Sequence, residues 1–529
     1  MSPEMRQSFP TGPFLLIALA LLTVYHAVPS FPYSGMDDTA FIPGNPQVRN
    51  GLSWDGLLWA LRGGEPFGLW TPLVWLSFMA EVSVFGLSPF IHHLDNLLLH
   101  LANVFLFARL LHRLGQSSRV VLTAAALFAL HPIHVESVVW IAERKDLLFL
   151  FFSLLTLLAH CRGERLTTLL FFFLATTAKP MAITLPILLL LLDYGLLGRA
   201  ASGFWPLLRQ KALLFLLALL VAVATFLLHE AQGNLADTRI LPLWARFDNA
   251  LVSYLAYPLK LLWPYPLAPN YPHPGTELPL WKPLLAAPLL LGLTVPVWKN
   301  RERWPFLFTG WFWYLIALLP ASGLVQFADQ AMADHFLYLP ALGLYLAAAG
   351  GVDRLLREKP RLTQAVTGVI LALLLLLSVL AHRQSLLWSS DEVLFRHTAA
   401  VTAPNARALT MLGLSLGNQE RWQEALPLLE EAVRLKPRME QARRLLGRTL
   451  LALQHPEEAL PHLESAVALG PQSAVNHLML ARAFRQLHRD DAARNHLRRA
   501  RELKPNLIPP VELAPLLEEA PLMLRRGAP

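Results

Sequence analysis

The sequence has almost no cysteine and little charge. Its 529 residues contain one cysteine, Cys161, and charged residues make up only 16% of the chain. One cysteine excludes an intramolecular disulfide, so any exported part of the chain must be held together by packing. Hydrophobic residues, by contrast, make up 54% of the chain and lie largely in unbroken runs rather than in periodic stripes. This composition is typical of an integral membrane protein.

The apolar runs predict about eleven transmembrane helices. A helix crosses the hydrocarbon core with roughly 17 to 25 apolar residues, and in lipid only helices or closed barrels satisfy their own backbone polar groups. The runs rich in Leu, Phe and Ala are therefore expected to be helical. They lie near residues 13–29, 92–112, 119–133, 147–161, 166–179, 182–196, 211–229, 281–298, 304–320, 336–352 and 362–382.

Three apolar segments need separate treatment. The first run lies near the N-terminus, but it lacks a small-x-small cleavage site and further spans follow it, so an uncleaved helix is expected rather than a signal peptide. Residues 249–264 carry Lys260 and two prolines, which favours a re-entrant or interfacial segment. The stretch 67–85 contains Trp70 and Trp75 and is expected to lie along the membrane interface.

The distribution of basic residues predicts the orientation. With a cytoplasmic N-terminus, the inside loops contain the Arg and Lys clusters at 109–119, 162–165, 199–211, 299–303 and 354–361, whereas the outside loops have far fewer basic residues. This asymmetry agrees with the positive-inside rule at every connection. An odd number of spans then places everything after about residue 383 outside.

The last part of the chain contains a repeat. Prolines at 437, 471 and 505 are 34 residues apart, which is the period of the tetratricopeptide helix-turn-helix unit. Small residues recur in register, among them Gly413, Gly447 and Ala481, and they let two helices approach closely. We therefore predict a transmembrane domain over 1–383, a linker over 384–404, three repeats over 405–505 and a tail over 506–529. Such arrays usually bind a peptide or a protein.

Two adjacent carboxylates follow the first predicted helix, at Asp37 and Asp38. Desolvating both at a membrane boundary is costly, and their repulsion is expected to raise one pKa. A raised pKa is what a general base requires near the working pH. On local grounds alone, an Asp-Asp pair in a loop is also typical of a turn or a helix cap.

The second predicted helix carries four polar residues on one face: His93, Asn96, His100 and Asn103. Their spacings of three, four and three residues align them along the helix. Polar groups inside a bilayer either hydrogen-bond a neighbouring helix or line a cavity, and both interpretations stay open here.

A dense polar segment follows the third predicted span. It contains His131-Pro-Ile-His134-Val-Glu136 and then Glu143-Arg144-Lys145-Asp146. The first string resembles metal ligands, but its spacing matches no zinc pattern, so no metal ligand is predicted. Arg144 and Lys145 are appropriate for binding a phosphate, with the guanidinium offering two hydrogen bonds at once. An interfacial cluster of salt bridges is the alternative.

Further polar residues lie at the predicted outer ends of helices, on the same side as Asp37. They are Lys179 before Pro180, Tyr271 and His273 in Tyr-Pro-His-Pro, and Asp334 with His335. The convergence of many polar residues on one membrane face favours a site there more than any single motif does.

These strings resemble the family of transmembrane O-mannosyltransferase-like proteins with C-terminal tetratricopeptide repeats, in a bacterial form. The resemblance covers nearly the whole chain. It rests on Asp37-Asp38, on His92-His93 through Asn103, on the strings from His131 to Ser137 and from Glu143 to Asp146, and on Ala178-Lys179-Pro180, Tyr271-Pro-His273-Pro and Gln330-Ala-Met-Ala-Asp334.

The resemblance implies a fold and an activity. The family is similar to the GT-C fold glycosyltransferases, which take a sugar from a polyprenyl phosphate, so the expected fold is all-α: a polytopic GT-C-like helix bundle followed by a tetratricopeptide-repeat solenoid. Asp37 or Asp38 would deprotonate an acceptor Ser/Thr hydroxyl, and the charge of the departing lipid phosphate would be stabilised by Arg144, Lys145 or Lys179. The other expected substrate-binding residues are His93, Asn96, His131, His134, Glu136, Asp146, Tyr271, His273, Asp334 and His335.

The expected donor is a polyprenyl-phosphate sugar of mannose type, and the expected acceptor is a protein presented by the repeats. No cofactor is assigned, and the need for a divalent cation is left open. Nucleic acid is not an expected partner. The expected location is the bacterial inner (cytoplasmic) membrane with the repeats on the periplasmic side. The chain departs from the family pattern in two places, at Trp70-Thr71-Pro72 where Trp-His-Pro is expected and at His335-Phe336 where Arg-Tyr is expected.

Two other classes of function remain open. A non-catalytic membrane scaffold would recruit partners through its repeats without turnover. A transporter is less favoured because no inverted repeat is visible in the sequence.

Overall fold

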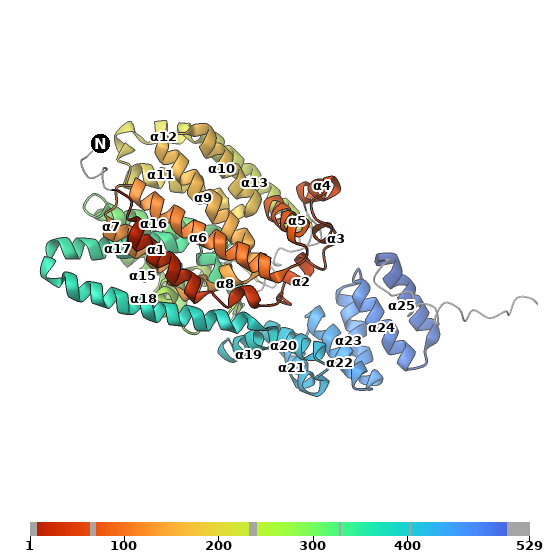
Figure 1. The fold of residues 1–529 in the computed structure, drawn as a ribbon. Helices are drawn as coiled ribbons and strands as arrows, with labels where there is room; N and C mark the ends of the chain where they lie inside the picture. Colours follow the sequence, from red (N-terminus) through yellow and green to blue (C-terminus); the bar gives the residue numbers. More distant parts are fainter. Residues whose placement is uncertain (1–7, 64–69, 232–240, 327–329, 403, 505–529) are drawn as a thin grey trace, which may run out of the picture. The chain divides into compact units, whose positions relative to one another are not determined.

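The computed structural model describes residues 8–63, 70–231, 241–326, 330–402 and 404–504 (Figure 1). The chain divides into two compact units, Met1–Ser390 and Asp391–Pro529. The expected all-α fold is confirmed. The helices of the first unit are α1 (Thr11–Val24), α2 (Asp38–Phe41), α3 (Pro46–Arg49), α4 (Trp54–Arg62), α5 (Pro72–Phe85), α6 (Pro89–Arg113), α7 (Ser118–Leu130), α8 (Val135–Val139), α9 (Arg144–Arg162), α10 (Arg165–Ala178), α11 (Leu185–Gly195), α12 (Phe204–Gln210), α13 (Ala212–Ala231), α14 (Leu243–Leu262), α15 (Trp281–Lys299), α16 (Pro305–Leu318), α17 (Pro340–Glu358) and α18 (Thr363–Leu386).

Short 3-10 helices connect several of these elements, often at a proline. They are η2 (Val28–Ser30), η3 (Pro132–His134), η4 (Ile141–Glu143), η5 (Pro180–Thr184), η6 (Arg199–Ser202), η7 (Leu319–Ala321), η8 (Asp334–Leu337), η9 (Pro360–Leu362) and η10 (Leu387–Ser389). Two short strands, β1 (Tyr271–Pro272) and β2 (Gln330–Met332), pair antiparallel with Tyr271 opposite Met332. This pairing holds the loop after α14 beside the segment that leads into η8.

Each of the eleven predicted spans overlaps a helix. Within the described residues, five helices are long and apolar enough to cross a membrane: Thr11–Ser30, Pro89–Arg113, Ala212–Glu230, Trp281–Lys299 and Pro360–Ser389. The pair Ser118–Leu130 and Pro132–Val139, bent by 53°, would make a sixth. The remaining predicted spans correspond to shorter or more charged helices, so the number eleven stays a prediction.

The two segments expected at the interface are helical. Residues 249–264 belong largely to α14, a 20-residue helix with Pro258 inside it. The described part of the stretch 67–85 forms α5, which is shorter than a full span. Residues 67–69 lie outside the described residues, as does the predicted tail 506–529.

The chain between α7 and α9 is irregular because Pro132 cannot continue the helix. The residue before a proline avoids helical geometry, and His131 accordingly has φ −78° and ψ 128°. Its side chain compensates for a lost helical bond, because Nδ1 of His131 accepts a hydrogen bond of 3.1 Å from the backbone N–H of Ile133. The segment η3–α8–η4 then leads to Glu143, where α9 begins.

Within residues 404–504, the second unit forms three helix pairs, as the 34-residue period predicts. A further helix, α19 (Asp391–Val401), precedes them and lies within the predicted linker 384–404. The pairs are α20 (Ala406–Asn418) with α21 (Trp422–Leu435), α22 (Glu440–Ala452) with α23 (Pro456–Leu469), and α24 (Ala474–Gln486) with α25 (Asp490–Leu503).

Candidate active site

Six ionisable side chains meet where α9, η5 and η8 begin. We call Glu136, Glu143, Lys145, Asp146, Lys179 and His335 the central cluster. Nζ of Lys145 lies 2.8 Å from Oε1 of Glu143. Lys179 pairs with Asp146, and its Nζ lies 3.9 Å from Oε2 of Glu143. The ammonium groups of Lys145 and Lys179 therefore lie beside the carboxylates of Glu143 and Asp146, although these side chains come from separate segments of the chain.

Local sequence explains how two of these side chains are positioned. Lys179 precedes Pro180, so its backbone is extended (φ −154°, ψ 131°) and α10 ends there. Asp146 lies in the first turn of α9, where the helix dipole favours an acidic side chain. Burial alone opposes ionisation of Glu143, but His335 and the ammonium groups of Lys145 and Lys179 lower the pKa of that carboxyl below its usual range.

His335 is oriented by Glu136. The backbone N–H of His335 donates to Oε2 of Glu136 at 3.1 Å, and Nδ1 of the ring lies 2.9 Å from Oε1. Nε2 of the same ring lies 3.9 Å from Oε1 of Glu143. The carboxylate of Glu136 thus fixes both the backbone and the ring of His335, which stands at one of the departures from the family pattern.

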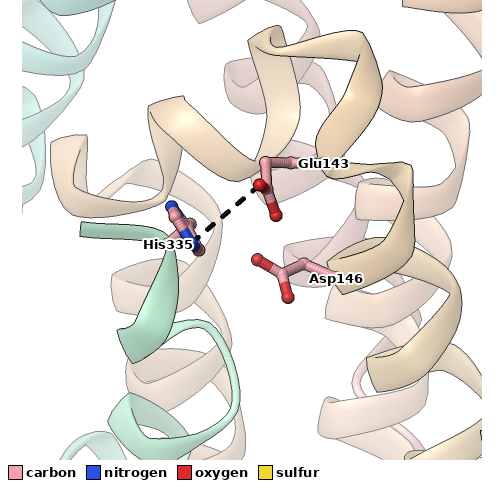
Figure 2. Close-up of side chains that lie close together, drawn as sticks. All are labelled: Glu143, Asp146 and His335. Carbon is pink, nitrogen blue, oxygen red and sulfur yellow. Dashed lines mark ion pairs between the residues drawn. The ribbon is translucent and has the colours of Figure 1, made fainter. Parts of the chain in front are cut away.

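Figure 2 shows Glu143, Asp146 and His335 pointing toward one another. One ligand atom from each lies within 4.8 Å of the others, a spacing that a divalent cation can bridge. The same carboxylates, however, already pair with Lys145 and Lys179. A divalent cation would be repelled by both ammonium groups at this distance. The donor set fits the two lysines better than a metal ion, so we assign no step of the reaction to a metal.

The adjacent carboxylates Asp37 and Asp38 have different environments. Asp38 is 1% exposed. Its Oδ1 accepts a hydrogen bond of 2.8 Å from the backbone N–H of Ala142, and its Oδ2 accepts one of 3.0 Å from that of Ser34. Asp37 is half-buried and close enough to Lys145 for their charges to interact. Asp38 therefore ties the first loop to η4, whereas Asp37 is the accessible carboxylate beside the central cluster.

Arg144 lies in a network of its own, away from Lys145. It is fully buried, and its guanidinium lies 4.4 Å from the centre of the Phe78 ring. Nε donates to Oδ1 of Asn96 at 2.9 Å, and a terminal nitrogen donates to the carbonyl of His92 at 2.8 Å. The other terminal nitrogen pairs with Glu81 and lies 3.4 Å from Asp95.

Two members of this network, Glu81 and Asp95, belong to no motif that the sequence patterns single out. Glu81 is an acidic residue inside the otherwise apolar α5, and a carboxylate in such surroundings requires a partner. An acid in this position therefore indicates a buried cation nearby, although the sequence does not show which residue supplies it. In the structure that cation is Arg144.

The polar face of α6 serves the fold. The amide nitrogen of Asn96 lies 3.4 to 3.5 Å from the carbonyls of Val138, Trp140 and Ile141, and that of Asn103 donates to the carbonyl of Leu147 at 3.0 Å. Nδ1 of His100 lies 2.7 Å from the Tyr338 hydroxyl. His93 is buried with its ring against Phe31. These contacts attach α6 to the irregular segment that carries Glu143.

His131 and His134 are also buried and bonded within the bundle. Nε2 of His131 lies 2.9 Å from the carbonyl of Leu261, and Nε2 of His134 lies 2.8 Å from the hydroxyl of Tyr345. Neither ring is among the side chains that form the central cluster. Their contacts attach this irregular segment to α14 and α17.

A second polar group lies where β1 meets β2. The Tyr271 hydroxyl donates to the Asp334 carboxylate, with O–O distances of 3.0 and 3.1 Å, and the ammonium of Lys260 lies 3.9 Å from the centre of the Tyr271 ring. Burial raises the pKa of Asp334 to about 7, although Lys260 and the Tyr271 hydroxyl oppose the shift. His273 accepts a hydrogen bond of 2.9 Å from the backbone N–H of Gly275. Asp334 precedes His335, so this group supports the central cluster.

Known proteins resemble the chain in both units. Models of the tetratricopeptide repeat match residues 410–474 and 450–511, which confirms the repeats. Protein O-mannosyl-transferase Tmtc1 of Drosophila melanogaster is 26% identical over 480 residues, covering 71% of this chain and 55% of that protein. Protein O-mannosyl-transferase TMTC4 of Mus musculus is 27% identical over 453 residues, covering 72% and 61%. The chain spans about half the length of the curated relatives that it matches over most of its own length.

A solved structure is similar to a smaller part of the chain. MamA of Desulfovibrio magneticus RS-1 is 25% identical, covering 23% of this chain and 71% of its own, with a TM-score of 0.22. That score is too low to support an argument about the fold. The similarity to the O-mannosyl-transferases, by contrast, covers 71% and 72% of this chain in the two relatives described above. The chain thus resembles the transmembrane O-mannosyltransferase-like proteins with tetratricopeptide repeats, as the strings in its sequence predict.

Proposed function

We propose that the chain is an integral-membrane glycosyltransferase that moves a mannose-like sugar from a polyprenyl phosphate to a Ser or Thr hydroxyl of an extracytoplasmic protein. The observation that carries this proposal is the accessible carboxylate of Asp37 beside the ammonium of Lys145. A base for the acceptor and a cation for the departing phosphate are the two charges that such a transfer requires.

The reaction has one bond-making and one bond-breaking event. Asp37 takes the proton from the acceptor hydroxyl while the hydroxyl oxygen forms a bond to the anomeric carbon. The bond between that carbon and the phosphate oxygen breaks, and the polyprenyl phosphate leaves with the electron pair. Lys145 and Lys179 stabilise the negative charge that develops on the phosphate.

The central cluster suits this role because its cations are held before substrate arrives. The side chains of Lys145 and Lys179 are 14% and 11% exposed, so each ammonium is anchored by a carboxylate yet not sealed from a ligand. A phosphate that approaches need not order these side chains, which lowers the entropy lost on binding. Glu143 and Asp146 are positioning residues that act through the two lysines.

The repeats give the proposal its acceptor. Helical repeats stack into an extended surface that commonly binds a peptide or a protein. We assign the protein to the bacterial inner membrane, with the repeats and Asp37 in the periplasm. The scaffold remains the second candidate, because the repeats alone would support it.

The test is transfer by the full chain in lipid nanodiscs, with radiolabelled polyprenyl-phosphate mannose and a Ser/Thr-containing acceptor protein. Asp37→Asn should lower turnover by about a hundredfold or more, the usual contribution of a general base, at an unchanged melting temperature. Asp55→Asn, an exposed acid on the same predicted face, is the matched control and should retain activity.

Asp38→Asn separates positioning from catalysis. One amide oxygen can replace only one of the two acceptors of Asp38, so this variant should melt at a lower temperature whatever its activity. Full turnover by Asp37→Asn would refute the role of Asp37. Binding of partners by the repeats with no transfer by the wild-type chain would favour the scaffold.

A further inference from the structure

A cavity of about 650 Å³ lies at the other end of the helices that carry the central cluster. It is lined by the last turns of α6 and α9 and the first turns of α10. Sixteen residues separate Asp146 of the central cluster from Arg162 of the cavity along α9, which at 1.5 Å per residue is about 24 Å. The cavity is therefore separate from the candidate active site and lies at the membrane face that the sequence predicts to be cytoplasmic.

The charge of the cavity is positive. Its lining contains Arg109, Arg113 and Arg162, together with His112, against a single acid, Glu164. Glu164 lies 3.9 Å from Arg162, with side chains 43% and 56% exposed, so solvent weakens that ion pair. The guanidinium of Arg109 lies over the Phe9 ring, 5.2 Å from its centre. Three guanidinium groups around one cavity favour an anion with several acceptor oxygens, and a phosphate is such an anion.

The rest of the lining is apolar. Phe105, Leu106, Leu155, Leu158 and Phe171 line the cavity beside the arginines. Apolar side chains continue from it along the outer surface of the helices toward the middle of the predicted spans: Leu98 on α6 is 50% exposed, and Leu170 on α10 is 54% exposed. A small hydrophilic anion gains nothing from this surface. A ligand with a phosphate and hydrocarbon chains can bind the arginines through its phosphate and the apolar surface through its chains.

We propose that this cavity binds one anionic phospholipid, with the headgroup phosphate between Arg109, Arg113 and Arg162 and the acyl chains along α6 and α10. The proposal is independent of the glycosyl transfer, because no residue of the cavity belongs to the central cluster. A bound lipid contacts the ends of three helices at once and stabilises their packing. The negative surface of a cytoplasmic leaflet supplies such lipids in excess.

The test is native mass spectrometry of the full chain released from detergent after titration with phosphatidylglycerol or phosphatidylcholine. Wild type should retain one phosphatidylglycerol in preference to phosphatidylcholine. The variant Arg109→Gln/Arg113→Gln/Arg162→Gln should bind it at least about tenfold more weakly, because the anionic headgroup loses three cationic partners.

The matched control removes the same charge elsewhere on the same predicted face. Arg165→Gln/Arg301→Gln/Arg361→Gln replaces three exposed arginines that do not line the cavity, and it should bind phosphatidylglycerol as wild type does. Equal losses in both triple variants would show a diffuse surface potential and would overturn the proposal. Displacement of the lipid by millimolar inorganic phosphate, with phosphate retained in its place, would show a site for free phosphate and would also overturn it.

A second variant keeps every charge and fills the space. Thr167 lines the cavity and is half-buried, so Thr167→Trp should place an indole inside it. Loss of phosphatidylglycerol binding at an unchanged circular dichroism spectrum is expected. Unchanged lipid binding by this correctly folded variant would place the lipid elsewhere and contradict the proposal, even where the triple arginine variant fails to fold.

Discussion

Arg144 and Lys145 are consecutive in sequence and have different tasks. The first turn of α9 directs the guanidinium of Arg144 toward Glu81 and Asn96. The ammonium of Lys145 pairs with Glu143 and is close enough to Asp37 for their charges to interact. Consecutive helical residues diverge by about 100° around the axis, so two neighbouring cations enter two separate networks. Arg144 is a positioning residue for α6 and α5, and Lys145 belongs to the candidate active site.

This difference predicts different outcomes for two substitutions, one mainly on stability and the other mainly on transfer. Arg144→Met leaves Glu81 buried without its cation and should destabilise the protein by about 3 to 5 kcal/mol. Adding Glu81→Gln should recover part of that loss, which a double-mutant cycle of thermal melts by tryptophan fluorescence would measure. Lys145→Met should reduce transfer with a smaller effect on melting. Equal melting temperatures for wild type and Arg144→Met would contradict the buried ion pair.

Asp334 predicts a pH dependence of stability. Its pKa is raised by burial from 3.8 to about 7, so the folded state favours the protonated carboxyl. The resulting stabilisation is fully present below the ordinary pKa and is lost as the pH rises through about 7. The melting temperature of wild type should therefore fall between pH 4 and pH 8 relative to that of Asp334→Asn, whose amide oxygen still accepts from Tyr271. A difference between the two melting curves that is independent of pH would contradict the assignment.

At the scale of elements, the two helices of a repeat pack closely because one position of the first helix carries glycine. A Cβ added to Gly447 would lie 2.4 Å from Cγ of Leu463, and one added to Gly413 would lie 2.6 Å from Cγ of Leu429. Both distances are shorter than any real carbon contact, so each pair of helices approaches over a missing side chain. The third repeat has Ala481 at the same place in the period.

Gly447→Ala should therefore destabilise the second unit by about 1 to 3 kcal/mol, because the added methyl group overpacks the contact with Leu463. This cost is larger than the gain in helix propensity from glycine to alanine. Leu463→Ala creates space at the same point, and the double variant should lose less than the sum of the single losses. Urea unfolding of the full chain, followed by circular dichroism at the repeat transition, measures both effects. Additive losses would show that the two residues do not press on one another.

The sequence predicts regular elements better than interrupted ones. Unbroken apolar runs and the 34-residue period locate the helices, because each signal is local. The path of the segment from His131 to Glu143 cannot be predicted in this way, because it depends on contacts with another helix. There the amide nitrogen of Asn96 on α6 binds three carbonyls of the segment. For the same reason the sequence finds Asp37 and Asp38 as a pair but not their separate roles, which depend on Ala142 and Lys145.

At the scale of the whole molecule, the proposed transfer requires that Asp37 and the repeats share one compartment. Loops rich in basic residues alternate along the chain with loops that have far fewer, and an odd number of spans brings residues beyond 383 to the side of the first loop. An acceptor held by the repeats can reach Asp37 only in that arrangement. The count of spans is therefore a condition for the chemistry.

Cysteine labelling tests the arrangement directly, because the chain has one cysteine to remove. In a Cys161→Ala background, Asp55→Cys in the first loop and Glu457→Cys in the repeats place thiols at exposed positions. A membrane-impermeant maleimide should label both in intact spheroplasts, whereas Arg301→Cys should react only after permeabilisation. Labelling of Asp55→Cys and Glu457→Cys from opposite sides would require an even number of spans. The bilayer would then separate the repeats from Asp37, and an acceptor protein bound by the repeats could not reach that carboxylate.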